Sequence, residues 1–343
     1  MLKVLAYTGG RNAPSHVFRV RQYVQPLKDA GIDLCECPSS AGAIPPARKW
    51  VRPLWGLWNV GERAPDTARS FAYDVVFFQR ELLSTFVTWE PLTKRPRVFD
   101  VDDAIWVHRG GGFARRLAGL CDHVICGNHF LAEEFSRWNP SVSVLPTPVD
   151  VHSYTPRIKE AARSKRLIIG WMGLKYNLKY LYAVERPLAE ILRRHPQTIL
   201  RVVSGEPPVF QNLPGGQVEF IRWTPQNDPP SIQGMDIGIM PLDDTTFARG
   251  KCSYKMLLYM ACGLPVVVSP VGMNAEVLQK GNVGFAASTD SDWVEQLDRL
   301  LRDPDLRVRM GTTGRQVVVE HYSVEALAPR LAQTIRKVAG EGQ

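Results

Sequence analysis

The stretch KCSYKMLLYMACGLPVVVSPVGMNAEVLQKGNVGF, residues 251–285, decides the fold of this chain. Its first apolar run predicts a helix that ends at Cys262. Gly263 can then adopt the left-handed conformation that commonly follows a helix, and Pro265 prevents the helix from continuing. The run PVVVS (265–269) has the continuous apolar character of a strand buried on both faces of a sheet. Helix, glycine turn and buried strand in this order predict one unit of an α/β sheet.

A glycine-containing loop follows this strand, and we expect it to lead into a second helix that begins at Glu276. The loop, Pro270–Asn274, contains Gly272. Glycine in a strand-to-helix turn allows backbone N–H groups and the helix N-terminus to face an anion. The alternative is that Gly272 only makes a turn.

Short β-branched or aromatic runs recur along the whole chain and alternate with helical apolar stripes. This alternation predicts an α/β fold with two doubly wound, Rossmann-like domains. The expected strands are 4–8, 75–78, 97–101, 123–126, 142–146, 167–172, 199–204, 218–223, 237–242, 265–269 and 283–287.

One polar stretch divides these strands into two groups. TPRIKEAARSKR, near residues 156–166, carries many charges and few apolar residues, as an exposed linker does. We therefore expect a first domain over 1–160 and a second over 161–322. The remaining residues, 323–343, are expected to form a helix that packs back toward the first domain.

Composition narrows the class of protein. With 343 residues, 45% hydrophobic and 22% charged, the chain is typical of globular proteins and is neither disordered nor fibrous. No apolar run approaches the roughly 20 residues of a membrane span, and the N-terminal apolar stretch is too short for a secretory signal. The six cysteines contain no CxxC pair, which argues against a zinc site and for reduced thiols. We therefore expect a cytoplasmic protein.

The chain is mildly basic, since Lys and Arg exceed Asp and Glu by 42 − 34 = 8. This excess predicts an anionic partner without identifying it. No basic run interleaved with aromatic residues is present, so we expect no nucleic-acid binding.

Several ordered motifs resemble one family. MACGLPVV (260–267), SPVGMNAEV (269–277) and GNVGF (281–285) resemble the C-terminal signature of GT-B glycosyltransferases of family 4, the glycosyl transferases group 1. The resemblance extends to residues 121–156, at the end of the first domain, and to MDIGIMPL (235–242). It therefore covers most of the chain.

The resemblance implies a GT-B fold, in which two Rossmann-like domains face a cleft. It implies transfer of a sugar from a nucleotide-diphosphate donor to a glycan or lipid-linked acceptor, with retention of configuration. The donor is a substrate, and such enzymes normally need neither a metal nor another cofactor. The alternatives that we keep are a sugar-nucleotide epimerase of the same fold and a degenerate, non-catalytic binding subunit.

The chain departs from the family pattern at two positions. The family often carries two glutamates, separated by seven residues, that contact the donor, and the aligned positions here are Gly250 and Leu258. Lys251 and Lys255 lie four residues apart instead, on one helical face if the helix begins this early. Because a lysine is a compact charge suited to phosphate, we expect this face to contact the donor diphosphate. The alternative is a solvated helix end.

The full set of expected donor-binding residues follows the carboxyl ends of the predicted strands and the predicted helix starts. It comprises Gly173, Lys175, Gly205, Lys251, Tyr254, Lys255, Gly272, Met273, Asn274 and Glu276.

The loop after the first strand is the expected acceptor side, since the resemblance implies that it reaches the cleft. Its candidate residues are Gly10, Arg11, Ser15 and Arg19, and the alternative for Arg19 is an exposed helix charge. The loop contains no GxGxxG, so a nicotinamide site has no support here.

Three carboxylates, Asp100, Asp102 and Asp103, end the strand at 97–101. Like charges repel one another, so the cluster requires a cleft, a metal or a substrate hydroxyl. We expect Asp102 or Asp103 to act catalytically by orienting the acceptor hydroxyl or the transferred sugar. The alternatives are a helix N-cap before Ala104 and the metal-binding DxD pattern of GT-A enzymes, which the GT-B signature outweighs.

A basic patch in the first domain is the candidate for peripheral contact with an anionic membrane at the inner face. It comprises Arg109, Arg115 and Arg116, and it continues through Gly110–Gly112 and Phe113. Scattered surface charge explains the patch equally well.

Overall fold

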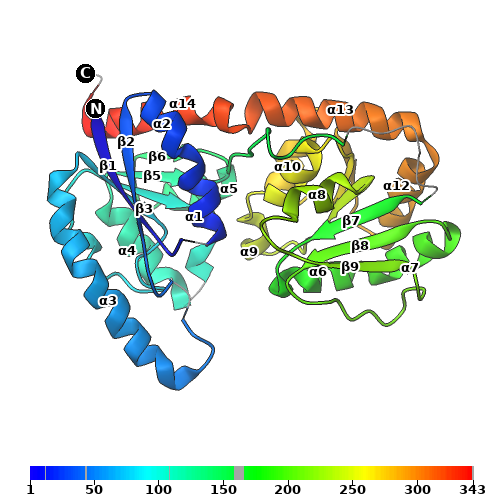
Figure 1. Ribbon diagram of the computed structural model, residues 1–343, viewed down its shortest axis with the longest axis horizontal. Helices are drawn as coiled ribbons and strands as arrows, with labels where there is room; N and C mark the ends of the chain where they lie inside the picture. Colours follow the sequence, from blue (N-terminus) through cyan, green and yellow to red (C-terminus); the bar gives the residue numbers. More distant parts are fainter. Residues whose placement is uncertain (12, 43–44, 108, 158–165, 342–343) are drawn as a thin grey trace. The chain divides into compact units, whose positions relative to one another are not determined.

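The computed structural model describes residues 1–11, 13–42, 45–107, 109–157 and 166–341, and the chain divides into two compact units (Figure 1). Unit 1 comprises Met1–Pro148, Arg249–Cys252 and Val324–Gln343, and unit 2 comprises Val149–Ala248 and Ser253–Ser323. Unit 1 therefore ends before the boundary expected at residue 160, and it includes a short segment from the second half of the sequence. Most of the expected linker, residues 158–165, lies outside the described residues.

Unit 1 contains a six-stranded parallel sheet with the order β2-β1-β3-β4-β5-β6. Its strands are β1 (Leu2–Thr8), β2 (Ile32–Pro38), β3 (Val75–Gln79), β4 (Arg97–Val101), β5 (His123–Cys126) and β6 (Val142–Val144). All but β2 were expected from the sequence. Strand β2 was not expected because Asp33 and Glu36 interrupt its run IDLCECP, so it lacks the continuous apolar character of a strand buried on both faces.

The helices of unit 1 complete a doubly wound arrangement. They are α1 (Pro14–Arg19), α2 (Val24–Asp29), α3 (Arg52–Arg69), α4 (Gly112–Leu120), α5 (His129–Phe135) and the C-terminal α14 (Val324–Ala339). Leu327, Leu331 and Ile335 of α14 are buried in one core cluster with residues of β1, β3 and α2. The apolar stripe of the C-terminal helix thus contributes to the core of unit 1, although it is far from that unit in sequence.

Unit 2 contains a second parallel sheet, with the order β12-β11-β10-β7-β8-β9. Its strands are β7 (Ile168–Met172), β8 (Ile199–Ser204), β9 (Val218–Arg222), β10 (Ile237–Met240), β11 (Val266–Val268) and β12 (Gly284–Ala286). All six correspond to expected strands. Strands β7, β8, β10 and β11 are mostly buried, as continuous apolar runs within a parallel sheet predict, whereas no position of the edge strand β9 is buried.

The helices of unit 2 include one whose first residue differs from the expected one. They are α6 (Leu178–Ala183), α7 (Glu185–Arg194), α8 (Asp228–Gln233), α9 (Thr246–Arg249, which ends in unit 1), α10 (Tyr254–Ala261), α11 (Met273–Leu278), α12 (Asp290–Arg302) and α13 (Pro304–His321). Gly263 has φ +71°, as expected for the residue after α10. Helix α11 begins at Met273 and not at Glu276, because Gly272 already makes the turn with φ 54° and ψ −132°.

A buried histidine makes the stability of unit 1 sensitive to pH. His123 of β5 is 7% exposed, and its two ring nitrogens lie 2.7 and 2.8 Å from the hydroxyl oxygens of Ser141 and Ser143. Burial, together with the charge of Lys337, lowers its pKa from 6.5 to about 4. The unfolded chain therefore binds a proton at a higher pH than the folded chain does.

We expect this histidine to contribute stability that is fully present above pH 6.5 and is lost as the pH falls toward 4. The loss reaches about 3 kcal/mol at pH 4, at about 1.4 kcal/mol per pKa unit. Denaturant unfolding of the wild type and of His123→Asn between pH 4 and 7 measures it. The variant should lack this part of the pH dependence, whereas His321→Asn, which changes a half-exposed ring, should retain it. Parallel pH curves for the wild type and His123→Asn would contradict the expectation.

Candidate functional site

Each sheet has one point at which the strand order reverses. In unit 1 the chain leaves β1 for β2 and then returns to β3 on the other side of β1; in unit 2 the reversal lies between β7 and β10. Open α/β sheets bind ligands outside the carboxyl ends of the strands at such points. The loops that follow these strands therefore define a candidate site in each unit, and we describe the two sites separately.

In unit 1 an arginine after β3 holds two of the three predicted carboxylates. Arg80 donates from Nε to Asp102 Oδ1 at 2.8 Å and forms a second ion pair with Asp103. Arg80 adopts φ +62°, a strained conformation that costs about 1 kcal/mol or more and is often found at functional sites. The expected repulsion within the acidic cluster is thus relieved by a cation that the sequence analysis did not identify.

For Asp102 and Asp103 the structure contradicts the helix N-cap that the sequence left open as an alternative. Neither caps an α-helix at Ala104, because only a short 3₁₀ turn (Ile105–Val107) follows and the Asp103 side chain pairs with Arg80. Burial raises the pKa of Asp102, but Arg80 and then Arg19 outweigh it and hold that pKa below its usual value. Asp102 is therefore a carboxylate at neutral pH, and its side chain remains 17% exposed.

The third carboxylate belongs to a buried ion pair. Arg19 and Asp100 are 2% and 1% exposed, and Arg19 Nε donates to Asp100 Oδ2 at 3.0 Å. Arg19 also donates to the carbonyl of Leu145 at 2.7 Å and contacts Thr147. Arg19 is therefore neither an exposed helix charge nor open to an acceptor; it joins α1 to β4 and to the loop after β6. Since Arg19 already occupies Asp100, the DxD pattern here does not present two open metal ligands.

The remaining acceptor-side candidates lie in the loop after β1. Gly10 has φ +150°, its carbonyl accepts from the Ala13 backbone N–H at 3.1 Å, and its oxygen lies 2.8 Å from Nδ1 of the buried His16. Arg11 is exposed and Ser15 is half-buried. Of the four candidates, Arg11 and Ser15 are thus the side chains that a ligand can reach.

A segment from the second half of the sequence completes the unit 1 site. Asn128, after β5, donates from its side-chain nitrogen to the carbonyls of Arg249 and Lys251 at 3.2 and 3.0 Å. Cys252 Sγ lies 3.1 Å from the carbonyl oxygen of Asp102, and a Cβ at Gly127 would lie 2.2 Å from that sulfur. Gly127 is therefore required for this close approach.

This placement corrects one expectation about the donor lysines. Helix α10 begins at Tyr254, so Lys251 precedes the helix, and the two lysines do not share a helical face. Lys251 belongs to unit 1, while Lys255 lies in the first turn of α10 in unit 2. Tyr254 and Lys255 are both half-buried.

In unit 2, basic residues follow β7 and pair with acidic residues after two other strands. Lys175 Nζ lies 2.7 Å from Glu206 Oε2, and Lys179 Nζ lies 4.0 Å from Asp243 Oδ2. The Lys175 side chain is 58% exposed, and its bond to Glu206 raises its pKa. Both lysines thus carry their charge at the carboxyl edge of the second sheet.

The two candidate glycines at this edge, Gly173 and Gly205, differ in the space that they leave for a side chain. A Cβ at Gly173 would lie 2.3 Å from the Trp171 ring, so a larger residue would displace that ring. Gly205 is exposed and has open space at its Cβ position. Only the first of these two positions requires glycine.

The loop between β11 and α11 is tied to the start of α10. Asn274 is fully buried; it donates to the Ser269 carbonyl at 3.0 Å and accepts from the Ser253 hydroxyl at 2.7 Å. Met273 is also buried, and Ser253 adopts φ +50°. The side chains of Met273 and Asn274 therefore stabilise the loop, and the Asn274 backbone N–H donates to the Val271 carbonyl at 3.2 Å. The backbone N–H groups of Gly272 and Met273 are the groups by which this loop could face an anion.

Glu276 lies in the first turn of α11 and is half-buried. Burial, and then the charge of Glu276, raises the pKa of Tyr322 to about 12. The Glu276 carboxylate thus lies near Tyr322 within unit 2. Across the described ranges, no three His, Cys, Asp or Glu side chains come together in an arrangement that could hold a metal ion.

Three functional candidates were missed by the sequence analysis. Arg80 and Asn128 each lie within two residues of the end of a buried strand, so the rule that singled out Asp102 could have found them. Ser253 had no signal in the sequence, since a left-handed backbone is uncommon for serine and its bond partner Asn274 lies 21 positions away.

The sequence of this chain is similar to those of known glycosyltransferases. Residues 165–303 match the family described as "Glycosyl transferases group 1". A D-inositol 3-phosphate glycosyltransferase of Corynebacterium jeikeium is 29% identical over 53% of this chain and 48% of its own length. A GDP-mannose-dependent alpha-(1-6)-phosphatidylinositol monomannoside mannosyltransferase of Mycolicibacterium smegmatis is 27% identical over 64% of each chain. The matches thus span about half to two-thirds of the length of these relatives.

A solved structure extends the likeness to the whole fold. Sucrose-phosphate synthase from Thermosynechococcus elongatus superposes with a TM-score of 0.73 at 14% identity, covering 99% of this chain and 100% of that one. The GT-B fold class is therefore confirmed, and so is the resemblance to the group 1 glycosyl transferases that the motifs of residues 251–285 predict.

Proposed function

We propose that this chain is a glycosyltransferase that moves a sugar from a nucleotide-diphosphate donor to a glycan or lipid-linked acceptor with retention of configuration. The observation that carries the proposal is the family match over residues 165–303. This range contains the entire carboxyl edge of the second sheet, including the loops after β7, β8 and β11. The relatives named above are glycosyltransferases, which supports the same class of reaction.

The donor side of the proposed reaction lies in unit 2. In a retaining transfer the donor phosphate leaves on the face that the acceptor attacks, so the main requirement is positive charge that stabilises the departing diphosphate. Lys175, Lys255 and the backbone N–H groups of Gly272 and Met273 are the groups that we assign to this task. Because Lys175 is paired with Glu206, a bound diphosphate competes with that carboxylate for it.

The acceptor side lies in unit 1. Asp102 is ionised and partly exposed, so it can accept a hydrogen bond from an acceptor hydroxyl. Arg80 holds both Asp102 and Asp103 in place. The name of the mycobacterial relative specifies a phosphatidylinositol glycolipid as acceptor. A lipid-linked acceptor, and with it peripheral contact with an anionic membrane, is accordingly part of our proposal for this chain.

A thermal-shift screen against a panel of nucleotide sugars tests the proposal directly. A ligand that binds only the folded protein raises its unfolding temperature, and a concentration of 100 times Kd adds about 2.7 kcal/mol of apparent stability. We expect at least one donor to raise the unfolding temperature and then to be consumed when an acceptor is added. An epimerised sugar nucleotide, formed from that donor without an acceptor, would indicate an epimerase, and binding without turnover across an acceptor panel would indicate a binding subunit. A protein whose unfolding temperature no donor raises would contradict the proposal.

A further inference from the structure

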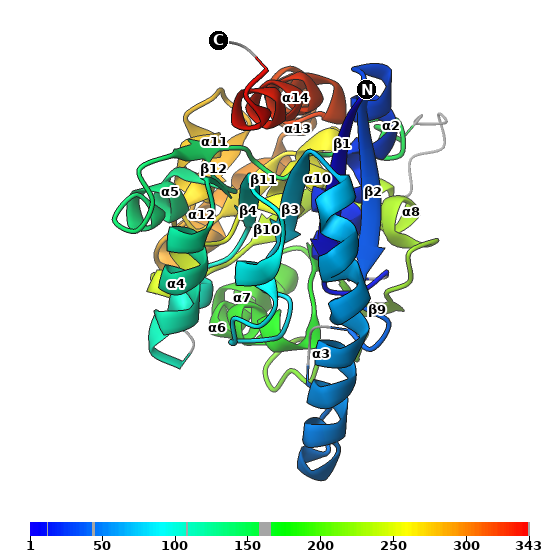
Figure 2. The ribbon, with the colours of Figure 1, turned by 90° about the vertical axis from the view of Figure 1, so that its left-hand side faces the viewer.

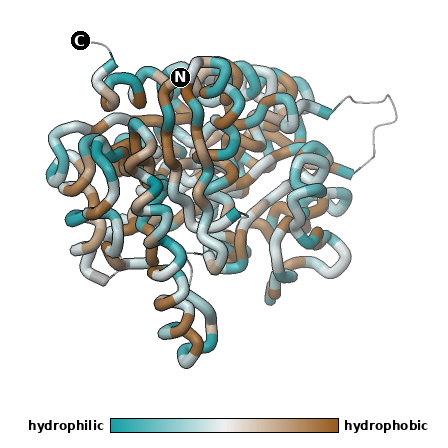
Figure 3. The backbone as a smooth tube through the Cα atoms, turned by 60° about the vertical axis from the view of Figure 1, so that its left-hand side comes forward, coloured by the Kyte–Doolittle hydropathy of each residue, from teal (hydrophilic) through white to brown (hydrophobic). Residues whose placement is uncertain are grey.

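Helix α3 exposes a continuous apolar face at its N-terminal end. The exposed side chains are Trp50, Leu54, Leu57 and Trp58, which are 72%, 66%, 71% and 63% exposed. Their spacing of four, seven and eight residues from Trp50 places them on one side of the helix and of the turn before it. Figure 3 shows apolar residues gathered on this helix, and Figure 2 shows α3 extending beyond the sheet of unit 1.

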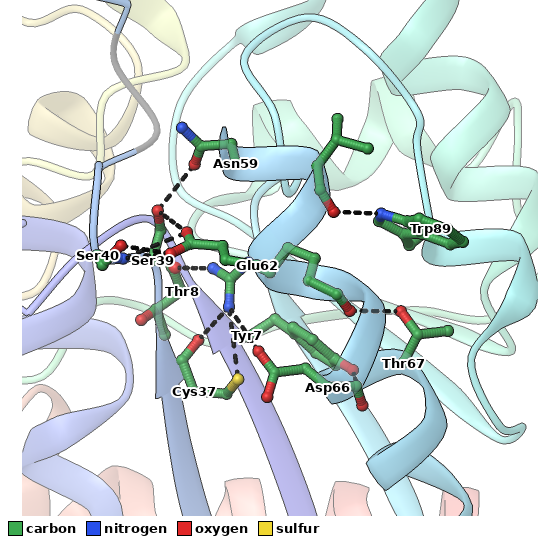
Figure 4. Close-up of polar contacts among 12 residues, drawn as sticks. Tyr7, Thr8, Cys37, Ser39, Ser40, Asn59, Glu62, Asp66, Thr67 and Trp89 are labelled. Carbon is green, nitrogen blue, oxygen red and sulfur yellow. Dashed lines mark hydrogen bonds and ion pairs between the residues drawn. The ribbon is translucent and has the colours of Figure 1, made fainter. Parts of the chain in front are cut away.

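The other half of the same helix is firmly attached to the sheet (Figure 4). Arg63 is 2% exposed and donates to the carbonyls of Thr8 and Cys37 at 2.7 and 2.9 Å. Glu62 accepts from the Ser39 hydroxyl at 2.6 Å, and Trp89 Nε1 donates to the Val60 carbonyl at 2.7 Å. The apolar turns are therefore presented from a rigid base.

The charge around this face has one sign. Between Glu36 and Glu62 the sequence contains no acidic residue, whereas Arg48, Lys49 and Arg52 are basic and exposed. A helix with tryptophan and leucine on one face and basic residues beside it is typical of segments that lie in the interface of a bilayer. Its positive charge complements anionic lipid headgroups.

The basic patch at Arg115 and Arg116 has no comparable apolar component. These arginines line a shallow surface depression of about 360 Å³ together with Gly112, Gly119, Arg137 and Trp138. Phe113, which the sequence analysis included in this patch, is only 9% exposed, and the side chain of Arg109 lies outside what the structure describes. Among the described helices none is long and apolar enough to cross a bilayer.

We infer that the turn at Lys49–Val51 and the first two turns of α3 form a membrane-docking segment. Trp50, Leu54, Leu57 and Trp58 enter the interface of an anionic bilayer, and Arg48, Lys49 and Arg52 contact its headgroups. The inference rests on the proposed function, which includes contact with a membrane, and it assigns that contact to this segment. The segment can dock on a membrane whether or not the protein transfers a sugar.

Vesicle co-sedimentation tests the apolar part of this surface. The vesicles consist of phosphatidylcholine with or without about 30% phosphatidylglycerol. The wild type should bind the anionic vesicles. Leu54→Ser with Leu57→Ser should weaken that binding at least tenfold, because the variant loses the free energy gained when two exposed leucine side chains move from water into the bilayer. The matched control, Val209→Ser with Val308→Ser, changes two residues that are 77% and 52% exposed in unit 2 and should bind like the wild type. Unchanged vesicle binding by the leucine variant would overturn the inference.

Charge reversal tests the basic part. Arg48→Glu with Lys49→Glu should abolish the preference for anionic vesicles, and Arg115→Glu with Arg116→Glu should leave it largely intact. The opposite result would assign the contact to the arginine patch and overturn the inference.

Light scattering without lipid tests whether this surface instead binds a second copy of this chain. If the wild type forms a dimer that the leucine variant loses, and the wild type does not bind vesicles, the inference is also overturned. A soluble-acceptor assay on the same variants should show unchanged transfer, which separates failure of docking from failure of the proposed function.

Discussion

Replacing Arg19 with methionine is expected to destabilise unit 1 by about 3–5 kcal/mol. The substitution leaves Asp100, which is 1% exposed, without the guanidinium that neutralises it, and it removes the bond to the Leu145 carbonyl. Burial raises the pKa of Asp100 even when Arg19 is present. Without Arg19 that pKa rises further, so the buried aspartate is expected to take up a proton.

Denaturant unfolding of the wild type and Arg19→Met at pH 7 and pH 5 measures this effect. The loss should be smaller at pH 5, because a carboxyl group whose folded-state pKa is raised is tolerated better as it becomes protonated. Arg21→Met is the matched control: it removes an arginine that is 43% exposed and pairs with Glu36, and it should cost less than about 1 kcal/mol. An Arg19→Met protein that is as stable as Arg21→Met at pH 7 would contradict this account of the buried pair.

Replacing Lys255 with alanine is expected to lower kcat/KM for the nucleotide-sugar donor by about a hundredfold. The physical reason is the loss of a positive charge that stabilises the departing diphosphate, a contribution of about 2.7 kcal/mol to the transition state. Part of the effect should appear as weaker donor binding, because the ground-state diphosphate carries charge as well.

Steady-state kinetics with donor titration, together with calorimetric donor binding, separates the two contributions. Lys280→Ala, which removes an exposed lysine elsewhere in unit 2, should change neither. Lys251→Ala should have a smaller effect than Lys255→Ala, since Lys251 precedes the helix and its segment is held by Asn128 in unit 1. Unchanged donor affinity and kcat/KM in Lys255→Ala would reject its assignment to the diphosphate.

The sequence predicted most strands because continuous apolar runs occur where both faces of a sheet are covered. The run VVFFQ of β3, for example, is buried at every position. It missed β2 because Asp33 and Glu36 interrupt the apolar run of that edge strand. The helix starts at Tyr254 and Met273 were misplaced for a different reason. Each depends on a left-handed residue directly before it, Ser253 in one case and Gly272 in the other.

The candidate sites were predictable only as loops. The carboxyl ends of parallel strands share one edge, so Asp102, Lys175 and Gly272 could be selected from the strand pattern alone. Their contacts could not be predicted, because the Arg80 pair and the bond between Ser253 and Asn274 join residues that are more than twenty positions apart. The same is true of Asn128 and the backbone of Lys251, which are separated by 123 positions.

The sequence by itself thus determined the α/β class, the positions of nearly all strands and the glycine turn after α10, since these depend on local periodicity and backbone preference. Only the tertiary structure decided that Arg19 is buried against Asp100, that Arg249–Cys252 belongs to unit 1 and that the apolar end of α3 is exposed. Those outcomes depend on which distant groups reach the same place. Burial, charge pairing and exposure are properties of a complete packing arrangement, and a local pattern does not contain them.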